Sequence, residues 1–467
     1  MLKGTIQYFF PDLNDEEIKK FGLLSATFFF IIGAYWLLRL LKNTVLFKIA
    51  FPVELGWPVC YGRLMQPVAK FWSPFVIITL MLIYSKLIDS FRRHQLFYII
   101  CSFYILIFST IGICLGLKSY FGYQILGKNI LAAIGWLSYF SAESFGSLAA
   151  ALFWSFTTSI STTQEAKKGF PFIIAGAQIG SIFGSFLPLF AGHLGGIWSL
   201  FLFASFFLIC VILTIRHFMK VIPKEMLVGN VEAAKTQEQK GEGFFDTFIG
   251  GLSLLFTRGY LFGVLIVSTL YEVAGTLIDY QMQSLADISP GFCGEVGFAS
   301  FQAIYGISVN TVAFLIALLG TRKILNILPL RYCLLIYPTT FCIALLSLFS
   351  YYYFWMPSPC NLLWATLSAM VMIKGLSYSI NNPTKEMLYI PTSKEAKFKT
   401  KGWIDTFGNR MSKLAGARVS NALKGNIQNL MFYGTALSLG IIGIWFIAAI
   451  YVGQKNSQLR KEGKIIK

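Results

Sequence analysis

Charged residues are scarce in this chain. Asp, Glu, Lys and Arg make up 13% of its 467 residues, about half the share found in ordinary soluble domains. Hydrophobic residues make up 56%, and there are 45 phenylalanines. Many apolar runs exceed the roughly 18–20 residues that span a bilayer, whereas buried helices of soluble proteins have runs of about 10–14 residues. The composition excludes one large soluble core and predicts an all-α polytopic membrane protein.

Residues that bind metals or form disulfides are also few. The chain has three histidines and eight cysteines. The histidines are far apart and no CxxC motif occurs, so we predict neither a metal site nor a cofactor. Most cysteines fall in apolar runs, where they behave as small hydrophobic residues. Cys293 and Cys360 are exceptions, because both fall in predicted outer loops and could pair.

Apolar stretches predict twelve transmembrane helices. The eleventh is too polar to be found by hydropathy and is inferred from the even count and from the spacing of its Gly, Arg and Lys residues. The predicted ranges are Phe21–Leu41, Phe71–Leu87, Leu96–Leu117, Ile130–Ile160, Phe170–Phe190, Ile197–Met219, Tyr260–Met282, Val296–Leu319, Leu328–Tyr351, Leu362–Ile380, Gly402–Ala422 and Leu430–Val452.

Basic residues follow every second predicted helix, whereas the loops after the fifth, seventh and ninth helices contain no Lys or Arg. Because cytoplasmic loops accumulate these residues, both termini are expected in the cytoplasm. The loop after the first helix, with Lys48, Arg63 and Lys70, departs from this rule.

One long polar stretch divides the chain into six helices and six helices. We predict a bundle over 1–219, a cytoplasmic linker over 220–250, a second bundle over 251–454 and a basic tail over 455–467. This 6+6 pattern is typical of major-facilitator-like transporters, whose halves move around a site near the bilayer midplane.

The net charge of +18 has three interpretations. It could indicate nucleic-acid binding, basic cytoplasmic loops or attraction of an anionic substrate. In a membrane protein the second and third are compatible, and we predict no nucleic-acid partner.

Several ionisable residues lie inside predicted helices, where each costs about 2.5–3.5 kcal/mol at the helix centre. The cations outnumber the acids, which favours a small polyanion such as a phosphate compound. Structural alternatives stay open: a cation near a helix end can extend to the interface, and an acid can brace a neighbour. These residues are Arg39, Lys42, Lys374, Arg410 and Lys413 with Glu143, Glu272 and Asp279.

The sequence "GAQIGSIFG" puts Gly176, Gly180 and Gly184 on one helix face. Small residues at this spacing let another helix approach closely. We therefore predict a tight helix–helix contact along this face.

Four segments carry a family resemblance. "NNPTKEMLYIPTSKEAKFKTKGWID" (Asn381–Asp405) resembles the signature after the tenth helix of the ATP/ADP translocases of plastids and intracellular bacteria. "LRLLKNTVL", "AESFGSLAAALFWSF" and "YEVAGTLIDYQ" are similar to patterns in the first, fourth and seventh helices of that family.

This resemblance implies a major-facilitator-like fold and nucleotide exchange by alternating access rather than an enzymatic activity. It implies that a nucleotide is bound by Arg39, Lys42, Glu143, Asp279 and Lys401, to which the charge analysis adds Lys374 and Arg410. It further implies ATP, ADP or a related nucleotide as substrate, with phosphate or a proton, and the inner membrane of an intracellular bacterium. We expect a monomer in the lipid bilayer.

The chain departs from the ATP/ADP pattern at several positions. Leu41 and Asn43 replace acidic residues, and Asp279 replaces a glutamate. Ser377 stands where the family has a lysine, and Lys374, one turn earlier, could supply the missing cation. Thr158-Ser159 and Asn382 also depart from it. These changes leave proton-coupled uptake, with Glu143 or Asp279 as the proton carrier, or exchange of NAD as alternatives. A membrane enzyme on a phosphorylated substrate and a non-transporting receptor are remoter alternatives.

The charged stretch Asn381–Lys401 is predicted to connect the tenth and eleventh helices on the cytoplasmic side. In this interpretation Lys385, Lys394 and Lys397 are solvated loop residues, and Lys401 is brought toward the cavity.

Overall fold

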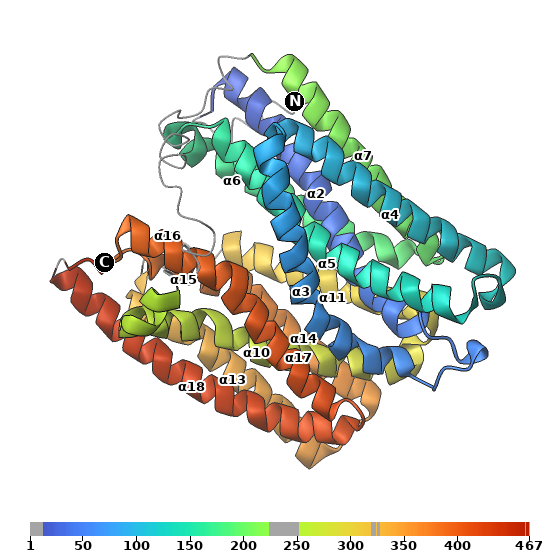
Figure 1. The fold of residues 1–467 in the computed structure, drawn as a ribbon. Coiled ribbons are helices and arrows are strands. Elements are labelled where there is room, and N and C mark those ends of the chain that lie inside the picture. Colours follow the sequence, from blue (N-terminus) through green and yellow to red (C-terminus); the bar gives the residue numbers. More distant parts are fainter. Residues whose placement is uncertain (1–12, 224–251, 319–323, 325–326, 463, 467) are drawn as a thin grey trace. The chain divides into compact units, whose positions relative to one another are not determined.

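The structure is a computed structural model that describes residues 13–223, 252–318, 324, 327–462 and 464–466. These residues are largely helical, and an isolated parallel β-bridge joins Thr392 and Ile466. The elements used below are α2 (Asp15–Lys48), α3 (Tyr61–Ser90), α4 (Arg93–Phe121), α5 (Gly127–Ser159), α6 (Thr163–Phe186), α7 (Ile197–Val221), α10 (Gly259–Ile288), α11 (Gly294–Ile316), α13 (Leu330–Trp355), α14 (Pro359–Leu376), the π-helix η7 (Ser377–Asn381), α15 (Asn382–Met387), α16 (Lys394–Trp403), the π-helix η8 (Ile404–Gly408), α17 (Asn409–Leu423) and α18 (Ile427–Lys461), as Figure 1 shows. Short 3-10 turns, Val53–Leu55, Tyr123–Ile125, Leu187–Phe190 and Pro290–Phe292, complete the described elements.

Ten helices in the described part of the chain are long and apolar enough to cross a membrane. This confirms the predicted all-helical, multi-pass membrane protein. Each of the twelve predicted ranges overlaps a helix, but α5 and the α16–η8–α17 run are not among the ten. Glu143 and several serines make α5 more polar, and charged residues do the same for α16 and α17.

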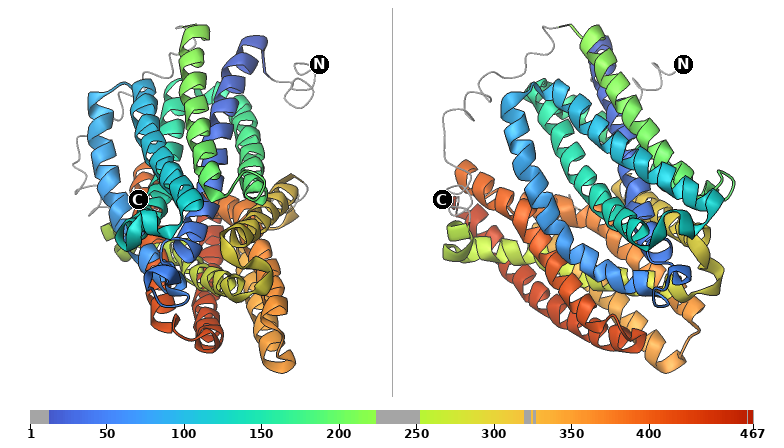
Figure 2. Two further views of the ribbon diagram at one scale, coloured as in Figure 1. Left: turned by 90° about the vertical axis from the view of Figure 1, so that its right-hand side faces the viewer. Right: turned by 45° about the vertical axis from the view of Figure 1, so that its right-hand side comes forward.

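Contacts divide the chain into two compact units, residues 1–62, 75–241 and 294–307 in the first and 63–74, 242–293 and 308–467 in the second. In the first unit α2 packs against α5, α6 and α7, and α4 packs against α5 and α7. Both views of Figure 2 show α4 and α7 side by side. In the second unit α10 packs against α14, α17 and α18, and α13 packs against α14 and α18.

Two helices contribute to both units. Residues 63–74 of α3 belong to the second unit and the rest of that helix to the first, while α11 passes from the first unit to the second after residue 307. Pro74 lies inside α3 at the position where its membership changes. Proline removes one backbone hydrogen bond of a helix, which is tolerated in membrane helices because neighbouring groups satisfy the freed carbonyl.

The glycine face of α6 contacts α2, as predicted. A Cβ atom at Gly176 would lie 2.1 Å from Ser25 Oγ, and one at Gly180 would lie 2.4 Å from the carbonyl oxygen of Phe29. A Cβ atom at Gly184 would lie 2.1 Å from the carbonyl oxygen of Gly33. The backbones of the two helices therefore approach more closely than any side chain at these positions would allow.

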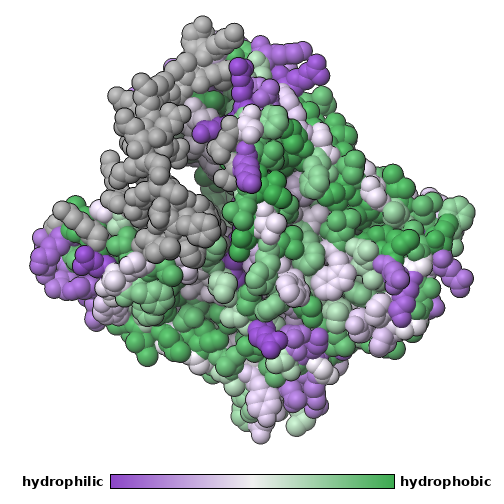
Figure 3. Space-filling model, in the orientation of Figure 1, coloured by the Kyte–Doolittle hydropathy of each residue, from purple (hydrophilic) through white to green (hydrophobic). Residues whose placement is uncertain are grey.

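Apolar side chains also cover outward helix faces. Phe103 and Leu106 are exposed on α4, and Ile444 and Ile447 are exposed on α18. In the view of Figure 3, hydrophobic side chains cover much of the surface that is drawn. A bilayer would bury such faces, because lipid tails are as apolar as these side chains.

Several predicted boundaries differ from the structure. Helix α3 begins at Tyr61, so Arg63 and Lys70 are helical and do not lie in a loop. The predicted connection Asn381–Lys401 is also largely helical, and residues 388–393 alone separate α15 from α16. Both stretches are polar, and prolines at 67 and 383 resemble helix ends in the sequence, whereas both lie within helices.

Other predicted segments lie partly within a different element or partly outside the described residues. Helix α18 continues to Lys461, into the predicted tail. Most of the predicted linker, from residue 224 onward, lies outside the described residues, as does residue 319 of the predicted eighth helix. Cys293 and Cys360 are exposed and unpaired with each other.

Candidate functional site

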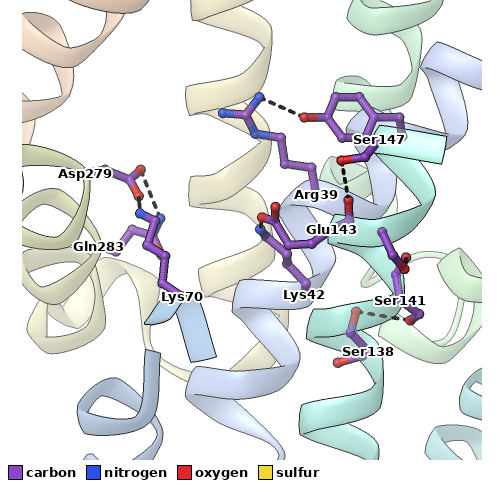
Figure 4. Close-up of polar contacts among 11 residues, drawn as sticks. Arg39, Lys42, Lys70, Ser138, Ser141, Glu143, Ser147, Asp279 and Gln283 are labelled. Atoms are coloured by element: carbon purple, nitrogen blue, oxygen red, sulfur yellow. Dashed lines mark hydrogen bonds and ion pairs between the residues drawn. The ribbon is translucent and has the colours of Figure 1, made fainter. Parts of the chain in front are cut away.

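The first unit holds an ion pair between its central helix and α5. Lys42 of α2 is 7% exposed, and its Nζ atom contacts Oε1 of Glu143, whose side chain is 33% exposed (Figure 4). The same ammonium lies 4.5 Å from the ring centre of Tyr139. A carboxylate and an aromatic ring are favourable partners for a lysine ammonium inside a helical bundle. Lys42 therefore does not snorkel, although it lies near the end of α2.

Arg39 lies one turn before Lys42 on α2 and contacts two aromatic rings. Its guanidinium carbon is 4.7 Å from the ring centre of Trp36, and Nη1 donates to the hydroxyl of Tyr35 at 3.4 Å (Figure 4). Stacking fixes the plane of the guanidinium. This arrangement suits an arginine that binds a phosphate or carboxylate in a bidentate manner.

The second unit gathers three lysines around one carboxylate. Glu272 of α10 is within electrostatic range of Lys413, Lys374 and Lys385. Lys374 Nζ lies 3.7 Å from the position that a Cβ atom of Gly275 would take, which places this ammonium against α10. Asp405 and Glu386 also act on Lys385, so the lysines of this cluster are partly balanced, and an anionic ligand would add to that balance.

Lys385 was predicted to be a solvated loop residue, and the structure corrects this. It lies on α15, partly buried, and its Nζ atom donates to the hydroxyl of Tyr271 at 3.0 Å and lies 4.5 Å from that ring centre. Its position follows from α14, η7 and α15 forming a continuous helical run from Pro359 to Met387, which turns this side chain toward α10.

Lys401 lies on α16 and pairs with Glu386 of α15, with 2.7 Å between Nζ and a carboxylate oxygen. Asp405 is in electrostatic range of both Lys401 and Lys385. Charges of alternating sign thus link Lys401 to the lysines around Glu272. Arg410, at the start of α17, is half-buried.

Asp279 is held by a residue that sequence analysis placed in a loop. Lys70 of α3 donates from Nζ to Oδ2 of Asp279 at 2.7 Å, and Gln283 Nε2 donates to Oδ1 at 3.2 Å (Figure 4). Two helical turns away, Arg63 Nη1 lies 3.7 Å from Oδ2 of Asp287. The one sequence signal for these pairs is the excess of basic residues after the first helix, which the positive-inside rule left unexplained.

The same order of segments and charges occurs in a known family. A family model described as TLC ATP/ADP transporter matches residues 2–121 and 135–456, which is nearly the whole chain. The chain belongs to the TLC ATP/ADP transporter family. This confirms the resemblance given by the sequence motifs, and it makes the protein a nucleotide transporter of a membrane rather than a member of an enzyme family.

Curated relatives of this TLC transporter come from plastids and from intracellular bacteria. ADP,ATP carrier protein 2, chloroplastic, of Arabidopsis thaliana is 25% identical over 95% of this chain and 76% of its own length. ADP,ATP carrier protein 1 of Chlamydia pneumoniae is 24% identical over 96% of this chain and 93% of its own length. The protein of the same name from Rickettsia prowazekii is 23% identical, with 88% and 86% covered.

Solved structures of transporters share the fold of this TLC transporter. A POT family transporter in complex with 5-aminolevulinic acid has a TM-score of 0.63 at 12% identity, covering 93% of this chain and 96% of that chain. The xylose transporter XylE from E. coli, in an inward open conformation, has a TM-score of 0.52 at 13% identity, covering 92% and 94%. At such identities the likeness establishes a major-facilitator-like fold alone.

Proposed function

We propose that this TLC transporter exchanges ATP and ADP across a membrane by alternating access, and that its lysines and arginines bind the phosphates. The observation that carries the proposal is the placement of lysines against α10 beside Glu272: Lys385 donates to the hydroxyl of Tyr271, and Lys374 lies against Gly275. A stable resting protein gains nothing from an excess of cations inside a helical bundle. A transporter of a polyanion does gain, because the substrate supplies the missing negative charge.

We propose twelve transmembrane helices in two repeats of six, with both termini in the cytoplasm. The packing of each unit supports a repeat. The first predicted helix packs on the fourth, fifth and sixth (α2 on α5, α6 and α7), and the seventh packs on the tenth, eleventh and twelfth (α10 on α14, α17 and α18). The boundaries of this arrangement are those given above: 1–219, 220–250, 251–454 and 455–467.

Within each unit the proposal assigns roles by charge. The phosphate-binding cations are Arg39, Lys42, Lys374, Lys401 and Arg410. Glu143 pairs with Lys42 and Asp279 with Lys70, so these carboxylates balance the cations of the empty protein, or orient the ribose. The positive charge in excess of these carboxylates remains unfavourable while no substrate is bound, which disfavours movement of the unloaded protein and makes transport an exchange.

Uptake of labelled ATP into proteoliposomes loaded with ADP tests the proposal. We expect Lys42→Ala and Lys401→Ala to reduce exchange strongly, since each removes a charge-assisted contact to phosphate. Lys397→Ala is the matched control, because Lys397 is exposed on the same helix as Lys401. If both lysine variants exchange nucleotide like the wild type, the assigned binding residues are wrong.

Proton-coupled nucleotide uptake is the second candidate, and the ion-paired acids favour it as an alternative. Glu143 lies in the bundle with a side chain that is 33% exposed, so water can reach it. Net uptake of nucleotide into empty liposomes, driven by an acidic exterior, would support this candidate. A strict need for internal nucleotide would exclude it.

We further propose a monomer in the inner membrane of an intracellular bacterium, because relatives occur in Rickettsia and Chlamydia.

A further inference from the structure

The first part of α3 is tied to α10 by two ion pairs of different character. The pair nearer the start of α3, called the outer pair, joins Arg63, which is 14% exposed, to Asp287, which is 4% exposed. The pair further along α3, called the inner pair, joins Lys70 to Asp279, and each is 18% exposed. Both side chains of the inner pair thus retain accessible surface that a ligand can contact, whereas Asp287 of the outer pair is almost completely buried.

Prolines of α3 explain why this segment is fastened to α10. Pro67 has no N–H to bond the carbonyl of Arg63, four residues earlier, and the hydroxyl of Tyr280 donates to that carbonyl at 3.3 Å instead. Pro74 likewise cannot bond the carbonyl of Lys70. The segment that carries Lys70 is therefore held by side chains of α10 as well as by its own helix.

The inner pair extends a cationic face of α10. Asp279 follows Glu272 by seven residues, which is two helical turns or about 10 Å along the axis, on nearly the same face. Lys374, Lys385 and Lys413 act on Glu272, and Lys70 contacts Asp279. Both carboxylates of this face therefore have lysines in electrostatic range, while Asp405 and Glu386 are further acids near Lys385.

We propose that Lys70 binds a phosphate of the nucleotide, and that Asp279 is its counter-ion in the empty transporter. Asp279 is then a positioning residue: its carboxylate, held by Gln283, orients the ammonium of Lys70 until a phosphate oxygen replaces it. An aspartate suits this role, because its short side chain can pair with the ammonium of Lys70 without extending beyond it into the space that a phosphate would occupy. The inference rests on the proposed function, since it needs a phosphorylated substrate.

The proposal requires opposite effects from the two single variants. Lys70→Gln removes a charge-assisted hydrogen bond to phosphate. The ATP concentration that gives half-maximal thermal stabilisation of the protein is therefore expected to rise tenfold or more. Asp279→Asn removes the competitor of phosphate, so that concentration is expected to fall severalfold. A salt bridge with a structural role only would make both variants less stable and would change ATP binding in neither direction.

The test uses the purified full-length transporter and measures thermal stabilisation by ATP over a range of concentrations. Arg63→Gln and Asp287→Asn are the matched controls, because this pair joins the same two helices. They are expected to lower the melting temperature while leaving the half-saturating ATP concentration unchanged. Should Lys70→Gln fail to fold, Lys70→Gln with Asp279→Asn leaves no unpaired charge and is expected to bind ATP as weakly.

The inference is overturned if Lys70→Gln, or the double variant in its place, binds ATP like the wild type. It is also overturned if Asp279→Asn does not bind ATP more tightly. These results differ from failure of the proposed function itself, in which neither ATP, ADP nor any other nucleotide would stabilise the wild-type protein.

Discussion

At the scale of single residues, Lys42 and Glu143 form an ion pair between a buried lysine and a partly exposed carboxylate in the first unit. Lys42→Met would leave the carboxylate of Glu143 without its cation. We expect a loss of about 1–3 kcal/mol in the free energy of unfolding, the cost of a half-buried group that loses its partner. Thermal unfolding in detergent measures it.

The double variant Lys42→Met with Glu143→Gln serves as the control, since it removes both charges. It should recover most of the lost stability, while nucleotide exchange should stay impaired. Equal instability of the single and double variants would show that packing, and not charge, is responsible.

Single functional residues were easier to predict than their partners. Lys42 and Glu143 could be found because a charge inside a predicted span is costly, but no spacing in the sequence connects residues that are 101 positions apart. Lys70 was missed because Pro67 resembles a helix breaker and the stretch before Phe71 carries Arg63 and Lys70, so α3 was predicted to begin ten residues too late. Lys385 was missed because its segment is polar and was taken for a loop.

At the scale of whole elements, the contact between α2 and α6 depends on glycine. A Cβ atom at Gly180 would lie 2.4 Å from the carbonyl oxygen of Phe29, and backbone cannot move aside as a flexible side chain can. We expect Gly180→Ala to cost about 1–3 kcal/mol of stability through overpacking, measured by the melting temperature.

Gly440→Ala is the control for the general effect of removing a helical glycine. Nothing lies within 4 Å of a Cβ atom at Gly440 in α18, and alanine is favoured over glycine in helices by about 0.5–1 kcal/mol. This variant should be as stable as the wild type or more so. If Gly180→Ala behaves in the same way, α2 and α6 do not pack as described.

The C-terminal tail is an element with a specific contact. The carbonyl of Ile466 accepts from the N–H of Ser393 at 2.8 Å, and the N–H of Ile466 donates to the carbonyl of Pro391 at 3.0 Å. We expect removal of residues 464–467 to speed hydrogen exchange at the Ser393 amide, because its acceptor is lost.

The Lys397 amide, which donates to Ser393 within α16 at 2.9 Å, is the internal reference and should change much less. Unchanged exchange at Ser393 after truncation would mean that the tail does not hold this turn in solution.

The helices themselves could largely be predicted from the sequence, since runs of apolar residues long enough to span a bilayer leave few alternatives. Even the polar eleventh range, Gly402–Ala422, overlaps η8 and α17, because the spacing of its Gly, Arg and Lys residues has a helical period. The unit boundaries could not be predicted, because the division of α3 and α11 between units depends on contacts between distant segments.

At the scale of the whole molecule, exchange moves charge. ATP carries one more negative charge than ADP, so each exchange of ATP for ADP transfers one net charge across the membrane. That transfer is worth about 2.3 kcal/mol at 100 mV, which corresponds to a roughly 50-fold change in the equilibrium ratio. We expect an interior negative potential in proteoliposomes to slow the uptake of ATP against internal ADP.

Exchange of ATP for ATP is the control, because it transfers no net charge and should not depend on the potential. Potential-independent uptake of ATP against ADP would contradict simple antiport and would indicate that a monovalent anion, such as the H2PO4⁻ form of phosphate, leaves together with ADP. Addition of internal phosphate then separates the cases: it should accelerate uptake when it is a co-substrate and leave uptake unchanged when it is not. That result decides whether the membrane potential biases nucleotide flow in a cell, since only the charge-moving exchange responds to the potential.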